Sequence, residues 1–140
     1  MSLSPRLALL VDALPLRPGM RVLEIGCGPG AAARAVAVRI GAGHVLAVDR
    51  SARAIALAAA GSAAEIAAGR LGLRCVAAEA FVLLPGEAPF DLAFGFRVGA
   101  LDGRHPEAGV RARARIAAAL VPGARLFVDG GDPLREVAFG

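Results

Sequence analysis

One segment, VLEIGCGPG at residues 22–30, constrains the fold of this chain more than any other. An apolar run typical of a strand stops at Gly26, Gly28 and Gly30, and residues 31–40 then have the pattern of a helix. Glycines at alternate positions let the backbone turn sharply and approach a ligand without a side chain in between. A strand, a glycine loop and a helix in this order predict an α/β fold with a ligand at the carboxyl end of the strand.

Strand-like and helix-like segments alternate along the rest of the chain. Strands are predicted at 21–25, 44–48, 74–78, 90–95 and 124–129, and helices at 7–14, 31–40, 51–69 and 106–120. Gly61 predicts a break in the third helix, because glycine destabilises a helix interior by ~1 kcal/mol relative to alanine. The alternation predicts one domain over residues 1–140, with a doubly wound, mainly parallel sheet of about five strands in the order 3-2-1-4-5 and helices on both faces.

The charge pattern narrows the range of partners. The net charge is +4, and the basic residues are arginines spread along the chain, apart from a cluster at Arg111, Arg113 and Arg115. With Arg104 this cluster would form a patch for an acidic substrate, although a solvated helix face is the simpler interpretation. Because no aromatic side chains are interleaved with these arginines, a nucleic-acid partner is disfavoured.

Apolar segments and cysteines indicate whether the chain contacts a membrane, where it is located and whether it binds a metal. No uncharged apolar run approaches the ~18 residues of a membrane span. The apolar stretch Leu7–Val11 ends at Asp12 and is too short for a signal peptide. Cys27 and Cys75 have neither a disulfide framework nor metal-ligand spacing. We therefore expect a cytoplasmic protein that contacts no membrane and holds no metal.

An acidic residue on each of the first two strands narrows the choice of cofactor class. Asp49 ends the second strand, where a carboxylate is well placed to accept hydrogen bonds from ribose hydroxyls. Gly26, Gly28 and Ala31 also satisfy the dinucleotide pattern G-x-G-x-x-G/A, which leaves an NAD-binding oxidoreductase as one alternative. Glu24 argues against it, because a carboxylate would repel a pyrophosphate but would suit the ammonium of an amino-acid moiety.

VLEIGCGPG and the later segment VLAVDRS at 45–51 resemble the first two motifs of the class I, Rossmann-like S-adenosylmethionine-dependent methyltransferases. CVAAEA at 75–80, PFDLAF at 89–94 and LVPGARLFV at 120–128 resemble the later motifs of that family, so the resemblance covers roughly residues 16–130. It implies S-adenosylmethionine as the cofactor and S-adenosylhomocysteine as the product.

The resemblance also implies a set of cofactor-binding residues. The glycine loop would hold the methionine portion, Asp49 the ribose, and the loop after the third strand the adenine, with Arg50 beside the ring. The full set is Glu24, Gly26, Cys27, Gly28, Gly30, Asp49, Arg50, Ser51, Glu79, Ala80, Gly95 and Phe96. Gly95 and Phe96 begin the segment in which the family places acceptor-facing residues.

Methyl transfer from a sulfonium needs alignment of donor and acceptor more than it needs a base. No catalytic residue is assigned, and the two candidates are Arg97, which could pair with an anionic substrate, and His105, which could act as a base. Arg97 as a packing residue and His105 as a solvated helix-start residue are the plainer alternatives. Because the Asn/Asp-Pro-Pro-Tyr/Phe signature of enzymes that methylate base amino groups is absent, we expect a small-molecule acceptor.

The sequence departs from the family at its end. Family members continue past the fifth strand with a helix and a hairpin, whereas only a short stretch follows Asp129 here. We therefore expect no sixth or seventh strand, and an unpaired edge on the fifth strand that a homodimer contact or a short C-terminal segment would cover. A non-catalytic S-adenosylmethionine-binding module that needs a partner chain is a second alternative function. The helix before the first strand is positioned so that it could serve as a lid.

Overall fold

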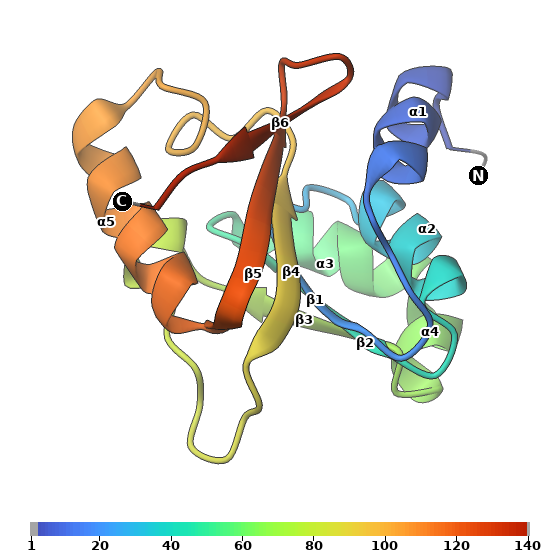
Figure 1. The fold of residues 1–140 in the computed structure, drawn as a ribbon. Helices are drawn as coiled ribbons and strands as arrows, with labels where there is room; N and C mark the ends of the chain where they lie inside the picture. The colour runs from blue at the N-terminus through green and yellow to red at the C-terminus, as the bar shows by residue number, and fades with distance from the viewer. Residues whose placement is uncertain (1–2, 140) are drawn as a thin grey trace.

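The fold is seen in a computed structural model that describes residues 3–139 (Figure 1). Strands and helices alternate along most of the chain. The strands are β1 (Arg21–Ile25), β2 (His44–Asp49), β3 (Leu71–Cys75), β4 (Phe90–Gly95), β5 (Leu120–Asp129) and β6 (Leu134–Val137). The helices are α1 (Pro5–Ala13), α2 (Ala31–Arg39), α3 (Ala52–Gly61), α4 (Ala63–Ala67), the short 3₁₀ helix η1 (Ala78–Ala80) and α5 (Pro106–Ala118).

The strands form one sheet in the order β3-β2-β1-β4-β5-β6. Neighbouring strands from β3 to β5 pair in parallel, and β6 pairs antiparallel with β5. Ile25 lies opposite Val48 on β2 and Gly95 on β4, so the carboxyl ends of the three central strands meet at one edge. The fold class predicted from the sequence is confirmed.

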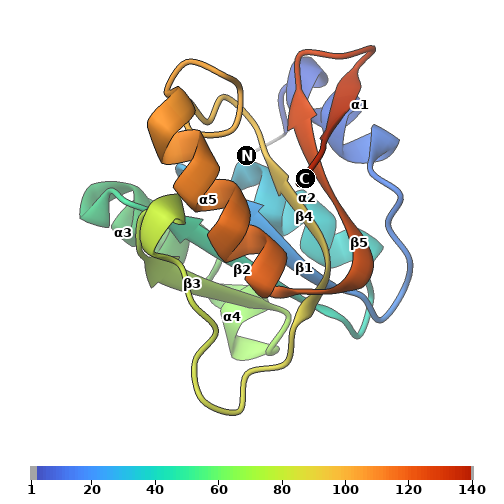
Figure 2. The same ribbon diagram turned by 60° about the vertical axis from the view of Figure 1, so that its left-hand side comes forward.

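Helices cover both faces of the sheet. Figures 1 and 2 show α1 and α2 on one face and α5 on the other. The first face buries apolar side chains of α1 and α2 against Val22 and Phe94, and the second buries Ile116 of α5 against Leu23 and Leu126. Alternate residues of β1 therefore belong to different cores, and Glu24, two positions after Val22, points to the α2 side.

The expectation of an open β5 edge is wrong, because a sixth strand covers it. Residues from Leu126 to Asp129 pair with β6, and the Val137 side chain is buried in the core beside α5. The alternative remedy, a short C-terminal cover, is confirmed. Because β6 covers the edge of β5, a homodimer formed through that edge is no longer expected.

One strand boundary differs from the sequence-based prediction, and one predicted helix break agrees with it. β3 lies three positions earlier than the predicted strand 74–78, because it begins two residues after the positive-φ Gly69 and includes Gly72, which packs on His44. The break predicted at Gly61 is confirmed. There the Arg34 guanidinium donates to the Ser62 hydroxyl at 3.0 Å and lies where a side chain at position 61 would extend.

Candidate functional site

Two adjoining cavities open at the carboxyl ends of β1, β2 and β4. One, the Glu24 cavity, has a volume of about 340 Å³ and is lined by Ser4, Arg6, Leu7, Glu24, Gly26, Cys27, Gly28, Pro29, Ala31, Ala32, Phe96 and Arg97. The other, the Asp49 cavity, has a volume of about 480 Å³ and is lined by Ile25, Gly26, Asp49, Arg50, Val76, Ala77, Ala78, Glu79, Arg97, Val98, Gly99, Ala100, Arg104, His105 and Ala108. Gly26 and Arg97 border both, so one elongated ligand can occupy the two cavities together.

Two glycines of the loop expose bare backbone to the Glu24 cavity. Gly26 and Gly28 have φ angles of 69° and 53°, a backbone region that other residues rarely adopt. A Cβ on Gly26 would lie 2.7 Å from a methyl group of Val98, whereas a Cβ on Gly28 would meet no atom within 4 Å. Because Gly28 lines the cavity, such a carbon would enter space that a ligand can use.

Asp49 fixes this loop to the end of β2. One carboxylate oxygen accepts a hydrogen bond from the Gly28 N–H at 2.9 Å, and the other accepts from the Ser51 N–H at 2.9 Å. Each oxygen has a second lone pair. Asp49 can therefore hold the loop and accept further donors from a ligand in its cavity.

Glu24 is a buried carboxyl with an unmet hydrogen-bonding capacity. Its side chain is 3% exposed, and within the described part of the chain its Oε1 atom has no hydrogen-bond partner. Burial, aided by the negative charge of Asp49 and opposed by Arg34, raises the pKa of Glu24 to about 8. A buried acceptor without a partner is destabilising by ~1–3 kcal/mol, so the site favours a ligand that brings a cationic donor.

The first turn of α2 faces the same cavity. Its N-cap residue, Gly30, offers no side-chain cap, and Ala31 and Ala32 line the cavity. Free N–H groups and the helix dipole favour an anionic group at this position. The Glu24 cavity therefore has one feature suited to an ammonium and another suited to a carboxylate.

Cys27 and Asp91 have structural roles. Burial, followed by the charges of Glu24 and Asp49, raises the pKa of the Cys27 thiol to about 12, so it stays protonated and unreactive. Asp91 accepts a hydrogen bond from the backbone N–H of Arg21 at 2.9 Å and so binds the start of β1.

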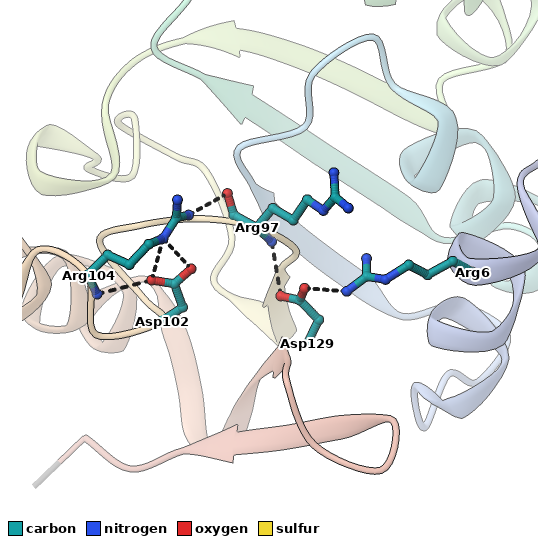
Figure 3. Close-up of polar contacts among 5 residues, drawn as sticks. All are labelled: Arg6, Arg97, Asp102, Arg104 and Asp129. Carbon is teal, nitrogen blue, oxygen red and sulfur yellow. Dashed lines mark hydrogen bonds and ion pairs between the residues drawn. The ribbon is translucent and has the colours of Figure 1, made fainter.

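The segment after β4 is fixed by a second strand-end aspartate, shown in Figure 3. Asp129, at the end of β5, accepts from the Arg97 N–H at 3.0 Å and from the Arg6 guanidinium at 2.8 Å. Burial tends to raise the pKa of Asp129, but these two donors outweigh it and hold the pKa below its usual value. Arg97 has a φ of 59°, an unusual conformation for a residue with a side chain, at a cost of about 1–3 kcal/mol.

Most of the residues predicted for the site meet at these cavities. Four do not line either one, namely Gly30, Ser51, Ala80 and Gly95. Gly30 and Ser51 instead cap α2 and α3, and Gly95 is buried under Val98 and Leu101. Of the two catalytic candidates, Arg97 borders both cavities, whereas His105 borders only the Asp49 cavity.

Sequence reasoning missed the contribution of α1. Ser4, Arg6 and Leu7 line the Glu24 cavity, far from its other residues along the chain. The one sequence signal was the place of this helix before β1, which had suggested a lid. Sequence reasoning placed Arg104 in a patch with Arg111, Arg113 and Arg115, whereas Arg104 alone of these four lines the Asp49 cavity, from the loop before α5.

Residues 3–139 offer neither a metal-binding cluster nor a membrane-spanning helix. Over this range, no group of three or more His, Cys, Asp or Glu side chains is arranged to hold a metal ion. Nor do these residues include a helix with the length and apolar character needed to span a membrane.

Comparison with known proteins gives one family and several relatives. The profile of the family described as "Methyltransferase domain" matches residues 22–123. A protein-L-isoaspartate O-methyltransferase of Methylorubrum populi is 40% identical over 126 residues, which cover 90% of this chain and 52% of that protein. The chain thus spans about half the length of the curated relatives it matches.

Solved structures agree on the fold. Phosphoethanolamine N-methyltransferase 2 of Haemonchus contortus, in complex with S-adenosyl-L-methionine, matches with a TM-score of 0.70 and 29% identity over 88% of this chain and 27% of that one. The [4+2]-cyclase SpnF matches with a TM-score of 0.69 and 27% identity over 87% of this chain and 42% of that one. A cyclase among these neighbours means that the fold alone does not fix the reaction.

The family assignment rests on the sequence profile, which spans β1 to the start of β5 and includes the glycine loop and Asp49. The enzyme class and cofactor predicted from the sequence, methyltransferase and S-adenosylmethionine, are those of this family. The chain therefore belongs to the methyltransferase-domain family, the class I, Rossmann-like S-adenosylmethionine-dependent methyltransferases.

Proposed function

We propose that this chain binds S-adenosylmethionine across the Glu24 and Asp49 cavities and transfers its methyl group to a small-molecule acceptor. The observation that carries the proposal is the buried, unpartnered carboxyl of Glu24 beside a glycine loop that leaves open space. A methionine moiety supplies the missing partner, because its ammonium can donate to Glu24. NAD offers a pyrophosphate there instead, which an ionised Glu24 would repel.

The remaining contacts follow from the same arrangement. The N–H groups at the start of α2 suit the carboxylate of the methionine portion. The free lone pairs of Asp49 suit the ribose hydroxyls, and Glu79 and Arg50 border the end of the Asp49 cavity left for the adenine. Gly30, Ser51, Ala80 and Gly95 support this site through the backbone or lie outside it.

When bound, the cofactor supplies an electrophilic methyl group, which the acceptor's lone pair attacks as the electrons of the C–S bond pass to sulfur. The chain contributes the alignment, for which well-oriented reactions gain ~7–11 kcal/mol. Phe96 and α1 border the Glu24 cavity, where they can shield part of a bound cofactor from water. An acceptor that must lose a proton can release it to solvent or to His105 at the neighbouring cavity.

The acceptor is the least constrained part of the proposal. A small molecule suits two cavities of a few hundred cubic ångströms. The names of the Methylorubrum relatives suggest a second candidate, the carboxylate of an isoaspartyl peptide. A single catalytic domain over residues 1–140 and a cytoplasmic location stay predictions from the sequence.

Calorimetric titration with S-adenosylmethionine, S-adenosylhomocysteine and NAD tests the cofactor. We expect micromolar binding of the first two, loss of binding in Asp49→Ala, and no change in Glu107→Gln, a surface carboxyl outside both cavities. Because the ammonium lowers the pKa of Glu24, binding near pH 7 should release protons, and the measured enthalpy should differ between phosphate and Tris buffers. Binding of NAD alone would overturn the proposal.

Turnover separates the enzyme from a binding module. The protein should form S-adenosylhomocysteine when it is offered a panel of small carboxylates, phenols and amines alongside an isoaspartyl peptide. Tight cofactor binding without product from any acceptor would favour the non-catalytic alternative.

A further inference from the structure

Arg97 combines an unfavourable backbone with a side chain that the fold does not use. Its φ of 59° lies in a region that glycine adopts freely, and no other residue with a side chain among those described has a positive φ. Strain of this kind persists only where the surroundings impose it, and it is concentrated at functional sites. An arginine at a position that favours glycine therefore suggests that its side chain has a use.

The surroundings impose this conformation from both sides of the residue (Figure 3). The Arg97 N–H donates to Asp129, and the Arg97 carbonyl accepts from the Arg104 guanidinium at 3.2 Å. Arg104 is in turn held by Asp102, with N–O distances of 2.8 and 3.0 Å. The main chain of Arg97 is thus fixed, and this fixes the direction in which its side chain leaves the loop.

The guanidinium of Arg97 makes no hydrogen bond or ion pair with any residue from 3 to 139, and Figure 3 shows it extending away from the Asp102–Arg104 pair. Of the two cations that line the Glu24 cavity, Arg6 is paired with Asp129, so Arg97 is the cation with unused capacity. Arg50 lines only the Asp49 cavity. Arg97 borders both cavities and lies at their junction.

We propose that Arg97 binds an anionic group, a carboxylate or a phosphate, on the small-molecule acceptor and so selects anionic substrates. The inference rests on the proposed function. The N–H groups at the start of α2 suit the cofactor's own carboxylate, so the Arg97 guanidinium remains available to the acceptor. An anion beside the guanidinium also balances the positive charge that the sulfonium brings to the site.

Arg97 takes no part in bond exchange under this proposal. The nucleophilic atom of the acceptor forms the new bond to carbon, the C–S bond breaks with its electrons going to sulfur, and any proton on the nucleophile passes to water. The anionic group stays bound to the guanidinium and orients the nucleophile toward the methyl group.

Nuclear magnetic resonance titrations of the protein saturated with S-adenosylhomocysteine test the proposal, with benzoate and phenyl phosphate as probes. Both should shift the Arg97 Nε–H resonance, and the larger shift indicates the preferred anion. Arg97→Gln should weaken probe binding at least tenfold, in line with the loss of a charge-assisted pair worth roughly 10–100-fold. Arg97→Lys should retain part of it, and Arg111→Gln, a surface charge on α5, should change nothing.

Arg97→Gly separates a binding role from a structural one. Glycine relieves the backbone strain, so this variant should lose probe binding as Arg97→Gln does while its Tm rises by about 4 °C. A lower Tm would mean that the side chain supports the fold, and it would overturn the proposal.

Affinity for S-adenosylhomocysteine separates a failure of this inference from a failure of the proposed function. It should change less than about twofold in Arg97→Gln, since the proposed cofactor contacts lie elsewhere. An equal loss of cofactor and probe binding would make Arg97 a cofactor residue and refute its role toward the acceptor. If the unmodified protein binds S-adenosylhomocysteine but neither probe, this inference fails and the proposed function stands. If it does not bind S-adenosylhomocysteine, both fail.

Discussion

The two halves of the sheet use the same device at their carboxyl edge. In one half Asp49, at the end of β2, holds the loop after β1 through the Gly28 N–H. In the other half Asp129, at the end of β5, holds the loop after β4 through the Arg97 N–H. In both, a strand-end carboxylate binds the backbone of the loop that follows the neighbouring strand, and the held residue has a positive φ.

The difference lies in the residue that is held. Glycine at position 28 leaves empty space, while arginine at position 97 places a cation at the edge of that space. The first half is therefore built to receive a ligand against the bare backbone, and the second to present a charge to it. Substitutions that affect one half and spare the other test this division.

The largest effect is expected at Glu24, in the half that receives the cofactor. Its folded pKa of about 8, against an ordinary value of 4.5, means that the folded state retains a proton that the unfolded state has lost. Stability should therefore fall as the pH rises from about 4.5 to 8 and level off above, by at most about 5 kcal/mol. Chemical denaturation of the ligand-free protein across this range measures the slope.

Glu24→Gln provides the matched control for this slope. The variant should lose the decline, be more stable than the parent at pH 8, and bind S-adenosylhomocysteine more weakly. Glu87, which accepts a hydrogen bond from the Arg74 guanidinium at 2.7 Å, has a lowered pKa despite its partial burial, as Asp129 has. Protonation of these two carboxylates removes stability in the opposite direction and at more acidic pH, so they do not mask the effect. An unchanged slope in Glu24→Gln would refute the buried-carboxyl account.

The two strand-end aspartates should differ most clearly in cofactor affinity. Asp49→Ala removes the hydrogen bonds proposed to the ribose and releases the glycine loop, so affinity for S-adenosylhomocysteine should fall roughly 100-fold or more. Asp129→Ala should leave it within a fewfold, because Asp129 lines neither cavity. Calorimetry on both variants measures the contrast, and equal losses would remove the distinction between the halves.

Sequence reasoning was most accurate where local chemistry decides the structure. The glycine loop could be predicted because alternate glycines and the flanking apolar runs specify a strand, a turn and a helix without help from the rest of the chain. Glu24 was identified for a similar reason, since a carboxyl in a buried strand is out of place unless a ligand explains it.

Sequence reasoning failed where contacts between residues distant in sequence determine the structure. No glycine marks the left-handed backbone of Arg97, because the hydrogen bond that its N–H donates to the Asp129 carboxylate imposes this conformation. β6 was missed because its two central residues are charged and exposed, and its partner strand rather than its own sequence pattern selects the extended form. The part of α1 in the Glu24 cavity could not be inferred from spacing along the chain.

A smaller effect should distinguish two glycines of the receiving half. Gly26→Ala brings a carbon to 2.7 Å from Val98 and should lower stability by about 2–4 kcal/mol through strain and overpacking. Gly28→Ala meets no atom, so the backbone strain of about 1 kcal/mol is its main cost, although its methyl group enters the cavity. Denaturant titration of both variants, and of Gly26→Ala with Val98→Ala, measures the difference. The second substitution should restore stability only if overpacking is the cause.

The smallest effect is expected for Arg6→Ala, which removes the one link between α1 and the Asp129 carboxylate. The Arg6 side chain is 51% exposed, and exposed ion pairs contribute at most about 1 kcal/mol, which salt reduces further. Asp129 keeps the Arg97 N–H as a donor, so the loop after β4 should hold its conformation. Because Arg6 also lines the Glu24 cavity, a small loss of S-adenosylhomocysteine affinity is expected. Thermal unfolding in low and high salt measures the loss of stability. A decrease of several kcal/mol would mean that Arg6 and Arg97 act as one unit on Asp129, and that the presenting half depends on α1 as closely as the receiving half depends on Asp49.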